Sequence, residues 1–314
     1  MESTFIKSVN IQPFNGTDDK YHADKKYISA SGMKKLKVSP AHFKEEEEIK
    51  ESDALLFGSA YHCFILESDK FEKQYYIFDD SVVCGALMAK GAKSPRATND
   101  YKTWLAGEQS FSDGKIMIDK ADFDKLQAMK DKLMHHPYAK MLLSNGVNEQ
   151  GYMGTIETEA GIIPVKFKPD HVNENKKIIV DLKTTIDASA DGFTRHAADL
   201  NYHLQASFYA DLMERISGDN RPYKFIFIAQ EKKKPYAFNL FESSPQFISQ
   251  GRYEYELLLQ LYKYCIDNNT WPGYQVWCEN KYGILELKLP AWGIKDITYY
   301  DHLNKVSKQK QLTT

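Results

Sequence analysis

The sequence predicts a mixed α/β fold, with a central mixed sheet flanked by helices and a helical part at the N-terminus. Helical periodicity and helix-start residues dominate the chain up to about residue 147. From residue 148 the chain changes to short apolar or alternating runs separated by turn residues. Helical patterns then alternate with further strands to about residue 267. Alternation of this kind is typical of a sheet buried between layers of helices.

The N-terminal half is predicted to contain an arm followed by several helices. Residues 1–27 are expected to form an arm or edge element. Ser29 and Ser31 can cap a helix over GMKKLK, and Ser39-Pro40 provides a second helix start. In the segment 52–68, helical spacing places Leu55, Ser59, His62 and Leu66 on one face, so we expect His62 on or beside an apolar stripe.

The next two segments differ in the secondary structure that their residues predict. Gly, Pro, Ser and Asn are scattered through residues 79–120, which we expect to form a loop-rich insertion or lid. Residues 120–143 follow a helical pattern with a break at Pro137.

The C-terminal half is expected to begin with three strands, GYMGTIET, IIPVKFKPD and KIIVDLKTT, forming an antiparallel meander with turns at 159–161 and 173–175. Helices follow near 188–198 and over 201–216. KFIFIAQ and YAFNLFE then form a hairpin, and a long helix covers about 244–267. We therefore divide the chain into an arm (1–27), one domain (28–285) and a C-terminal tail (286–314).

Composition excludes several classes of protein. The 314 residues are 42% hydrophobic, which suffices for a sizeable core, and the four cysteines are scattered singly. This spacing excludes structural zinc, an iron–sulfur cluster and a disulfide framework. No segment has the composition of a signal peptide or of a membrane span, so we expect a cytoplasmic protein without membrane contact.

Charge gives no direct sign of a nucleic-acid partner. The net charge is −2, whereas nucleic-acid-binding domains are often strongly basic. Lysines and arginines nevertheless gather at 25–37, 90–96, 232–234 and 305–310, and acidic residues at 45–48. A DNA-binding role would require the basic runs to meet on one face, and otherwise they form ordinary solvated surface.

Charged residues in and beside an apolar strand indicate a site. Asp181 and Lys183 follow Ile178-Ile179-Val180, and burying such groups is costly unless something compensates. Because strand side chains alternate, Lys166, Lys168 and Asp170 share one face of their strand, as do Asp181 and Lys183 in the next. If the turn pairs these strands, Asp170, Asp181 and Lys183 converge. Mg²⁺ or Mn²⁺ would relieve the repulsion of the two carboxylates, and the lysine would orient water or stabilise phosphorane charge.

The spacing P-D, ten residues, then D-L-K is the signature of the PD-(D/E)XK nuclease superfamily. The plain alternative is an edge hairpin with a surface Asp–Lys pair. Two further patterns resemble its RecB-like branch: Gly58 and His62 form G-x-x-x-H, and Gln205 and Tyr209 form Q-x-x-x-Y on one helical face. Taken singly, His62 reads as a core histidine and Tyr209 as helix packing.

A longer resemblance covers about residues 27–280. The stretches YISASGMKKLKVSPAHFKE, ALLFGSAYHCFILESDKFEKQYYIF, KPD, DLKTTIDAS and YHLQASFYADL resemble the C-terminal nuclease domain of RecE-type recombination exonucleases (exodeoxyribonuclease VIII) of prophages. The resemblance implies a restriction-endonuclease-like core and a Mg²⁺-dependent exonuclease that degrades linear double-stranded DNA from 5′ ends. It also implies a ring-shaped homo-oligomer and a single-strand annealing protein as partner. The full-length enzymes have a long additional N-terminal region for which we expect no counterpart here, so a partner contact made by that region is not carried over.

The same resemblance implies roles for individual residues. Metal ligands would be Asp170, Asp181 and the Leu182 carbonyl, with His62 joining the metal site. Lys183 would be the catalytic lysine, and Gln205 and Tyr209 would shape the site or contact DNA. DNA contacts are expected more weakly from Lys166 and Lys168, the latter standing where relatives often have arginine. Glu149 is an additional acidic candidate.

Two other readings stay open. A helicase- or CRISPR-associated nuclease of the same branch is disfavoured, because the chain has no G-x-x-x-x-G-K-[ST] loop and no cluster-type cysteine spacing. A catalytically silent DNA-binding or assembly protein is disfavoured by the presence of Asp170, Asp181 and Lys183 together.

Overall fold

A computed structural model describes residues 5–45, 52–219, 221–274 and 284–290. The chain divides into two compact units, Met1–Trp271 and Pro272–Thr314, and every helix and strand named below lies in the first. Most of the expected acidic run 45–48, the basic run 305–310 and residues 291–314 of the expected tail lie outside the described residues.

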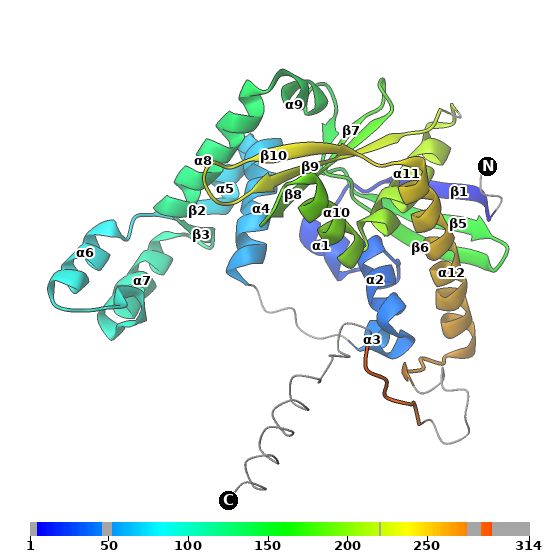
Figure 1. The fold of residues 1–314 in the computed structure, drawn as a ribbon, viewed down its shortest axis with the longest axis horizontal. Coiled ribbons are helices and arrows are strands. Elements are labelled where there is room, and N and C mark those ends of the chain that lie inside the picture. Colours follow the sequence, from blue (N-terminus) through cyan, green and yellow to red (C-terminus); the bar gives the residue numbers. More distant parts are fainter. Residues whose placement is uncertain (1–4, 46–51, 220, 275–283, 291–314) are drawn as a thin grey trace, which may run out of the picture. The chain divides into compact units, whose positions relative to one another are not determined.

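The first unit is built around a five-stranded mixed sheet. Its central strands, β8 and β9, run parallel, and the remaining neighbours pair antiparallel. The strand order is β10 (Phe238–Glu242), β9 (Lys224–Glu231), β8 (Ile178–Thr185), β7 (His171–Asn173) and β4 (Val147–Asn148). The predicted fold class, a mixed central sheet flanked by helices, is confirmed (Figure 1).

A second, antiparallel sheet has three strands, β1 (Ile6–Pro13), β5 (Tyr152–Thr158) and β6 (Gly161–Phe167). The N-terminal segment therefore contributes an edge strand, followed by the short helix α1 (Asp18–Ala23). The expected meander over 151–185 is wrong in one respect, because β5–β6 and β7–β8 belong to different sheets. The chain leaves the ladder at Lys168, and Pro169 has no N–H to continue it.

The two faces of the central sheet are covered by different helices. Ile179, Phe225 and Phe227 belong to one hydrophobic core, and Val180 and Ile226 belong to the other. This alternation follows from the period of two along a strand. The first core includes residues of α2 (Ala30–Val38), α10 (Ala190–Asp199), α11 (Tyr202–Ser217) and α12 (Pro245–Asn268); the second includes residues of α4 (Asp53–Leu66), α5 (Ser68–Gln74), α8 (Lys120–His135) and α9 (Pro137–Leu142) (Figure 1).

Helix starts follow the sequence signals. Ser29 caps α2, Ser39 caps α3 (Pro40–Lys44), and Ser244 caps α12, each by accepting a backbone N–H bond. The predicted break at Pro137 separates α8 from α9. In α4 the expected shared face is wrong at its N-terminal end: Leu55 is 51% exposed, whereas Phe57, Ala60 and Tyr61 are buried.

The expectation of a loop-rich segment over 79–120 is also wrong. The structure places α6 (Ser81–Ala89), a 3₁₀ turn at Pro95–Ala97 and α7 (Asn99–Phe111) between β2 (Tyr75–Phe78) and β3 (Ile116–Asp119), which pair in parallel. Gly91 and Gly114 adopt positive φ in the connections, and Pro95 opens the 3₁₀ turn, so these residues separate the helices. Figure 1 shows α6 and α7 side by side, beyond β2 and β3.

Across the described part of the chain, no helix combines the length and the apolar character that crossing a bilayer requires.

Candidate active site

Asp181 and Lys183 lie in the middle of the sheet rather than on a surface hairpin. Both belong to β8, on the face that packs against α11, because they continue the alternation of Ile179. Asp181 is 1% exposed. Its Oδ2 lies 2.5 Å from Lys183 Nζ and its Oδ1 accepts a 2.6 Å hydrogen bond from Gln205 Nε2 of α11. Burial of this carboxylate is therefore offset by a cation and an amide donor.

Asp170 reaches the same place from the break between the two sheets. The antiparallel register pairs His171 with Val180, so the next position outward sets Asp170 opposite Asp181. Asp170 Oδ2 accepts a 2.7 Å hydrogen bond from the backbone N–H of Leu182. Since the N–H and C=O of a strand residue point to the same edge, the Leu182 carbonyl is directed to this edge, beyond the end of β7.

His62 and Glu149 complete a cluster with Asp170. His62 Nδ1, from α4, lies 3.4 Å from Asp170 Oδ2 and 3.6 Å from Glu149 Oε1. Glu149 follows β4, has φ of 51°, and donates its N–H to the Asp170 carbonyl at 2.9 Å. A positive φ in a residue other than glycine is uncommon and carries a conformational cost.

The neighbouring Asn148 fixes this arrangement. Its Nδ2 donates to the Leu66 carbonyl at the end of α4 at 2.5 Å, and its Oδ1 lies 2.5 Å from Nδ1 of His171. One side chain therefore joins α4, β4 and β7, the three elements that bring His62, Glu149 and Asp170 together.

The electrostatics of the cluster are those of crowded carboxylates. Burial raises the pKa of Asp170 to about 7; the His62 imidazolium opposes this rise, and the carboxylates of Asp181 and Glu149 add to it. Burial lowers the pKa of His62, but Asp170 and Glu149 outweigh it and raise that pKa to about 9. Burial also lowers the pKa of Lys183, yet Asp181 and Asp170 raise it well above its ordinary value, so Lys183 is a cation at neutral pH.

The donor set fits a divalent cation. One ligand atom each from His62, Glu149 and Asp170 lies within 4.8 Å of the others, close enough to share one ion at ordinary metal–ligand distances. Carboxylate oxygens are the ligands that Mg²⁺ and Mn²⁺ prefer. Asp181 is not one of these three: its Oδ2 forms an ion pair with Lys183, and its Oδ1 accepts from Gln205.

The helix α11 carries both expected pattern residues to the site. Gln205 contacts Asp181, as described above. Tyr209, one turn on, is buried and packs on Phe167 with ring centroids 5.4 Å apart, and its hydroxyl oxygen accepts from the backbone N–H of Lys168. Tyr209 thus supports the segment between β6 and β7, where the chain passes from one sheet to the other and which carries Asp170.

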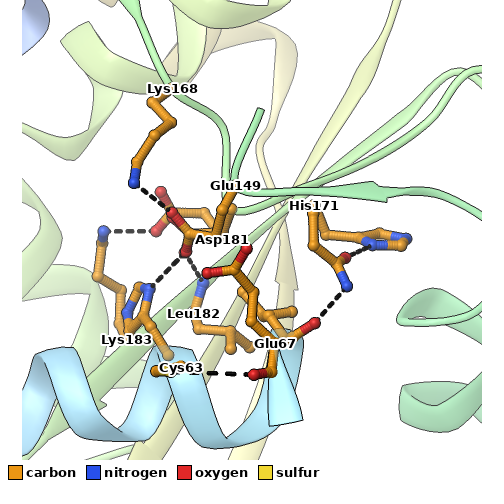
Figure 2. Close-up of polar contacts among 12 residues, drawn as sticks. Cys63, Glu67, Glu149, Lys168, His171, Asp181, Leu182 and Lys183 are labelled. Carbon is orange, nitrogen blue, oxygen red and sulfur yellow. Dashed lines mark hydrogen bonds and ion pairs between the residues drawn. The ribbon is translucent and has the colours of Figure 1, made fainter. Parts of the chain in front are cut away.

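The two weaker DNA-contact candidates are placed differently. Lys168 Nζ lies 2.9 Å from Glu149 Oε2 and 3.1 Å from Asp18 Oδ1, at the edge of the cluster (Figure 2). The Lys166 ammonium instead donates to the carbonyls of Tyr21 and Asp24, at 2.7 and 2.6 Å. Lys166 therefore anchors the C-terminal end of α1 to β6.

The sequence reasoning missed two residues beside Lys183. Tyr202 of α11 lies under Lys183 Nζ, 4.9 Å from its ring centroid, and Lys34 Nζ of α2 lies 5.0 Å from the same centroid. Burial, and then repulsion by Lys183, lowers the pKa of Lys34 to about 8. The only signal was the basic run 25–37, which does not say which lysine faces the sheet.

The combination of a mixed sheet, an Asp–Leu–Lys strand and a preceding Pro-Asp at its edge defines a domain of the PD-(D/E)XK nuclease class. In agreement, residues 29–282 match the family model described as PDDEXK-like domain of unknown function (DUF3799). The chain belongs to this family, and the matched range lies within the predicted domain 28–285.

Comparison with solved structures agrees at the level of the fold. The crystal structure of a protein from Eubacterium rectale, described as a proposed exonuclease, aligns with a TM-score of 0.55 at 18% identity, covering 91% of this chain and 98% of that chain. The structure of SSO0001 covers 64% of this chain and 84% of its own at 16% identity, with a TM-score of 0.27, too low to bear on the fold. A search of curated proteins finds no match.

Proposed function

We propose that the protein is a divalent-metal-dependent nuclease that hydrolyses phosphodiester bonds in DNA. The observation that carries the proposal is the apposition of two groups: the His62–Glu149–Asp170 cluster, and the buried Asp181–Lys183 pair directly across the β7–β8 register. An edge hairpin with a surface Asp–Lys pair would need neither a buried Asp181 nor a histidine supplied by a distant helix, as His62 is by α4.

Mg²⁺, or Mn²⁺, would be held by Asp170 with Glu149 and His62, and by Asp181 and the Leu182 carbonyl once substrate has entered. When bound, such an ion supplies Lewis-acid polarisation of the phosphate and favours deprotonation of water. A set of imidazole and carboxylate ligands is compatible with both ions. Imidazole binds the softer Mn²⁺ better than it binds Mg²⁺.

The side chains of the chain itself supply the remaining chemistry. Lys183, held cationic by Asp181, would place its ammonium against a non-bridging phosphate oxygen, where negative charge grows during attack by water. Gln205 would keep Asp181 oriented while Lys183 shifts towards the phosphate. Tyr209 would hold the Lys168–Asp170 segment in place.

We further propose that the enzyme is an exonuclease acting on the ends of linear double-stranded DNA, 5′ to 3′, in phage-type recombination. Support comes from the sequence resemblance to RecE-type exonucleases and from the fold shared with the Eubacterium rectale protein. By the same resemblance, the chain would form a homo-oligomeric ring and cooperate with a single-strand annealing protein. We also propose that it acts in the cytoplasm, where its DNA substrate would be found.

The test is digestion of linear duplex DNA labelled at either the 5′ or the 3′ end, with Mg²⁺ or with EDTA. We expect metal-dependent release of the 5′ label first, no loss of closed circular DNA, and no activity in Lys183→Ala. Lys102→Ala, which removes an exposed lysine on α7, is the matched control and should digest like wild type.

Equal cleavage by wild type and Lys183→Ala would overturn the site assignment. Release of the 3′ label first would overturn the proposed 5′-to-3′ polarity, but the protein would still be a nuclease. Binding of DNA without cleavage under either metal would instead favour the catalytically silent DNA-binding protein.

A further inference from the structure

A second concave feature adjoins the candidate active site. It is a cavity of about 680 Å³ lined by residues of α1, α2, α3, β6 and the C-terminal end of α12. Two of its lining residues, Lys168 and Tyr209, also belong to the candidate active site. The cavity and the candidate active site are therefore contiguous, because they share these two residues.

The lining of the cavity is strongly basic. Five lysines line it, against one acidic residue, Asp24. Lys35 and Lys44 are exposed, and neither forms an ion pair with any carboxylate of the described residues. An Oδ of Asp24 already accepts the backbone N–H of Lys26 at 3.0 Å. Lys35 and Lys44 thus present positive charge to a ligand, which favours an anion.

Aromatic rings form one wall of the cavity. Phe43 of α3 stacks on Trp271, with centroids 5.6 Å apart and an interplanar angle of 18°, and Tyr262 of α12 packs edge-on against Phe43 at 5.5 Å. Lys44 Nζ lies 5.2 Å from the centroid of the Trp271 ring. Nε1 of Trp271 is buried and finds no acceptor among the described residues.

From this combination we propose that the cavity binds a single-stranded segment of nucleic acid, continuous with the strand in the active site. Phosphates would contact Lys35 and Lys44, and a base would pack against the Phe43–Trp271 wall. Cationic grooves interleaved with aromatic side chains are the usual means of binding single strands, whereas a duplex keeps its bases stacked inside and offers none to a protein ring. The inference rests on the proposed function, since it assigns a path to the substrate of that site.

Binding can be measured separately from cleavage. A fluorescein-labelled oligothymidylate of ten nucleotides is titrated with protein in EDTA, by anisotropy, over a series of salt concentrations. We expect Lys35→Ala/Lys44→Ala to raise Kd at least about tenfold at low salt, and to lower the slope of log K against log salt by about 1.4, since each single-strand phosphate contact contributes about 0.7. The control Lys73→Ala/Lys102→Ala removes two exposed lysines outside the cavity and should stay within about twofold of wild type.

A second readout locates the ligand. The unlabelled oligonucleotide should quench part of the tryptophan fluorescence of wild type, and Trp271→Phe should remove that part while retaining a two-state melting curve. An unchanged Kd and salt slope in Lys35→Ala/Lys44→Ala, or an unchanged quench in Trp271→Phe, would overturn the assignment. So would the absence of oligonucleotide binding to wild type.

Failure of this inference and failure of the nuclease proposal give different results. If the cavity binds nothing but the nuclease exists, wild type and Lys35→Ala/Lys44→Ala digest duplex ends equally. If the cavity binds single strands but the protein is not a nuclease, the anisotropy and quenching results hold while no divalent metal produces cleavage.

Discussion

At the scale of single residues, the buried pair in β8 dominates. Asp181 and Lys183 neutralise each other inside a sheet, and the side chain of Lys183 is only 17% exposed. Removing one partner leaves the other as an uncompensated buried charge, which is more costly than removing both. Stability and activity should therefore respond differently to the same set of substitutions.

Comparison of a single variant with a double variant tests this difference. We expect Asp181→Ala to lower the free energy of unfolding by about 3 kcal/mol, and Asp181→Ala/Lys183→Met to recover part of that loss, because the stranded ammonium is gone. Both variants should be inactive. Urea unfolding and the end-label digestion give the two readouts. A double variant less stable than Asp181→Ala would contradict the pairing.

The two α11 residues should matter less than the β8 pair. Gln205→Leu loses the bond to Asp181 Oδ1, and Tyr209→Phe loses the bond to the Lys168 backbone, while both keep the charged groups. We expect rate losses of about tenfold for each, against at least about 10³-fold for Lys183→Ala, since that variant removes the cation facing the developing charge. Single-turnover digestion measures all three, and losses of equal size would assign Tyr209 or Gln205 a direct chemical role.

At the scale of elements, α4 must be held rigidly to bring His62 over the site. The hydroxyl of Tyr61, the preceding residue, donates to Gln230 Oε1 of β9 at 2.7 Å, and Gln230 Nε2 donates to the Met129 carbonyl of α8 at 3.1 Å. Both side chains are fully buried. This short chain of bonds links α4, β9 and α8.

Gln230→Leu would leave the buried Tyr61 hydroxyl without its acceptor and would remove the second hydrogen bond of the Met129 carbonyl, which lies inside α8. We expect the free energy of unfolding to fall by about 2 kcal/mol, and Tyr61→Phe/Gln230→Leu to cost less than the sum of the single substitutions, because the orphaned hydroxyl is removed. Urea unfolding of the three variants measures this. Strict additivity would show that the two side chains act independently.

The side chain of Glu254, on α12, links this helix to α2 and α11 by ion pairs. Its carboxylate binds Lys37 Nζ at 2.5 Å and His203 Nε2 at 3.1 Å, and accepts from Gln250 at 2.9 Å. Burial raises the pKa of Glu254, but these partners outweigh burial and lower it to about 2, from a usual value near 4.5. Because the folded-state pKa is depressed, the stabilisation is present above the unfolded-state pKa and is lost as pH falls from about 4.5 towards 2.

Glu254→Gln should therefore lower the free energy of unfolding by about 1 kcal/mol at pH 7, a value reduced for solvent screening, and by almost nothing near pH 2. Chemical unfolding across this pH range measures it. Glu159→Gln, in the exposed turn before β6, is the control and should show no such trend. A loss that persists at pH 2 would show that the ionised carboxylate is not the source.

At the scale of the whole molecule, the site exists because two sheets and both helical layers meet at one strand edge. His62 comes from the α4 side of the central sheet, Asp181 faces the α11 side, and Asp170 stands at the edge where the chain passes between sheets. Bringing three carboxylates and a histidine together raises the free energy of the metal-free fold through repulsion and burial.

A divalent ion should therefore stabilise the entire fold. We expect Mn²⁺ at about 100 times its Kd to contribute about 2.7 kcal/mol and to raise Tm by about 5 °C. The shift should vanish in Asp170→Asn/His62→Ala and persist in Asp69→Asn, an exposed carboxylate outside the site. Differential scanning fluorimetry measures it, and an equal shift in all three proteins would show that the ion binds elsewhere.

Local pattern alone determined much of this protein. The period of two along β8 set Asp181 and Lys183 on one face, the Q-x-x-x-Y spacing set Gln205 and Tyr209 on one face of α11, and serine hydroxyls marked the starts of α2, α3 and α12. These features depend on neighbouring residues, whose geometry the chain fixes locally. The scattered glycines of 79–120 misled for the same reason, because they end helices as readily as they form loops.

Tertiary structure decided what local pattern does not encode. The division of the expected meander into two sheets, the entry of Glu149 into the cluster, the approach of Lys34 to Tyr202, and the cavity beside Lys168 and Tyr209 join segments far apart in the chain. Such contacts depend on how whole helices and sheets pack, and that packing is set by burial over many residues together, so no single stretch of sequence carries it.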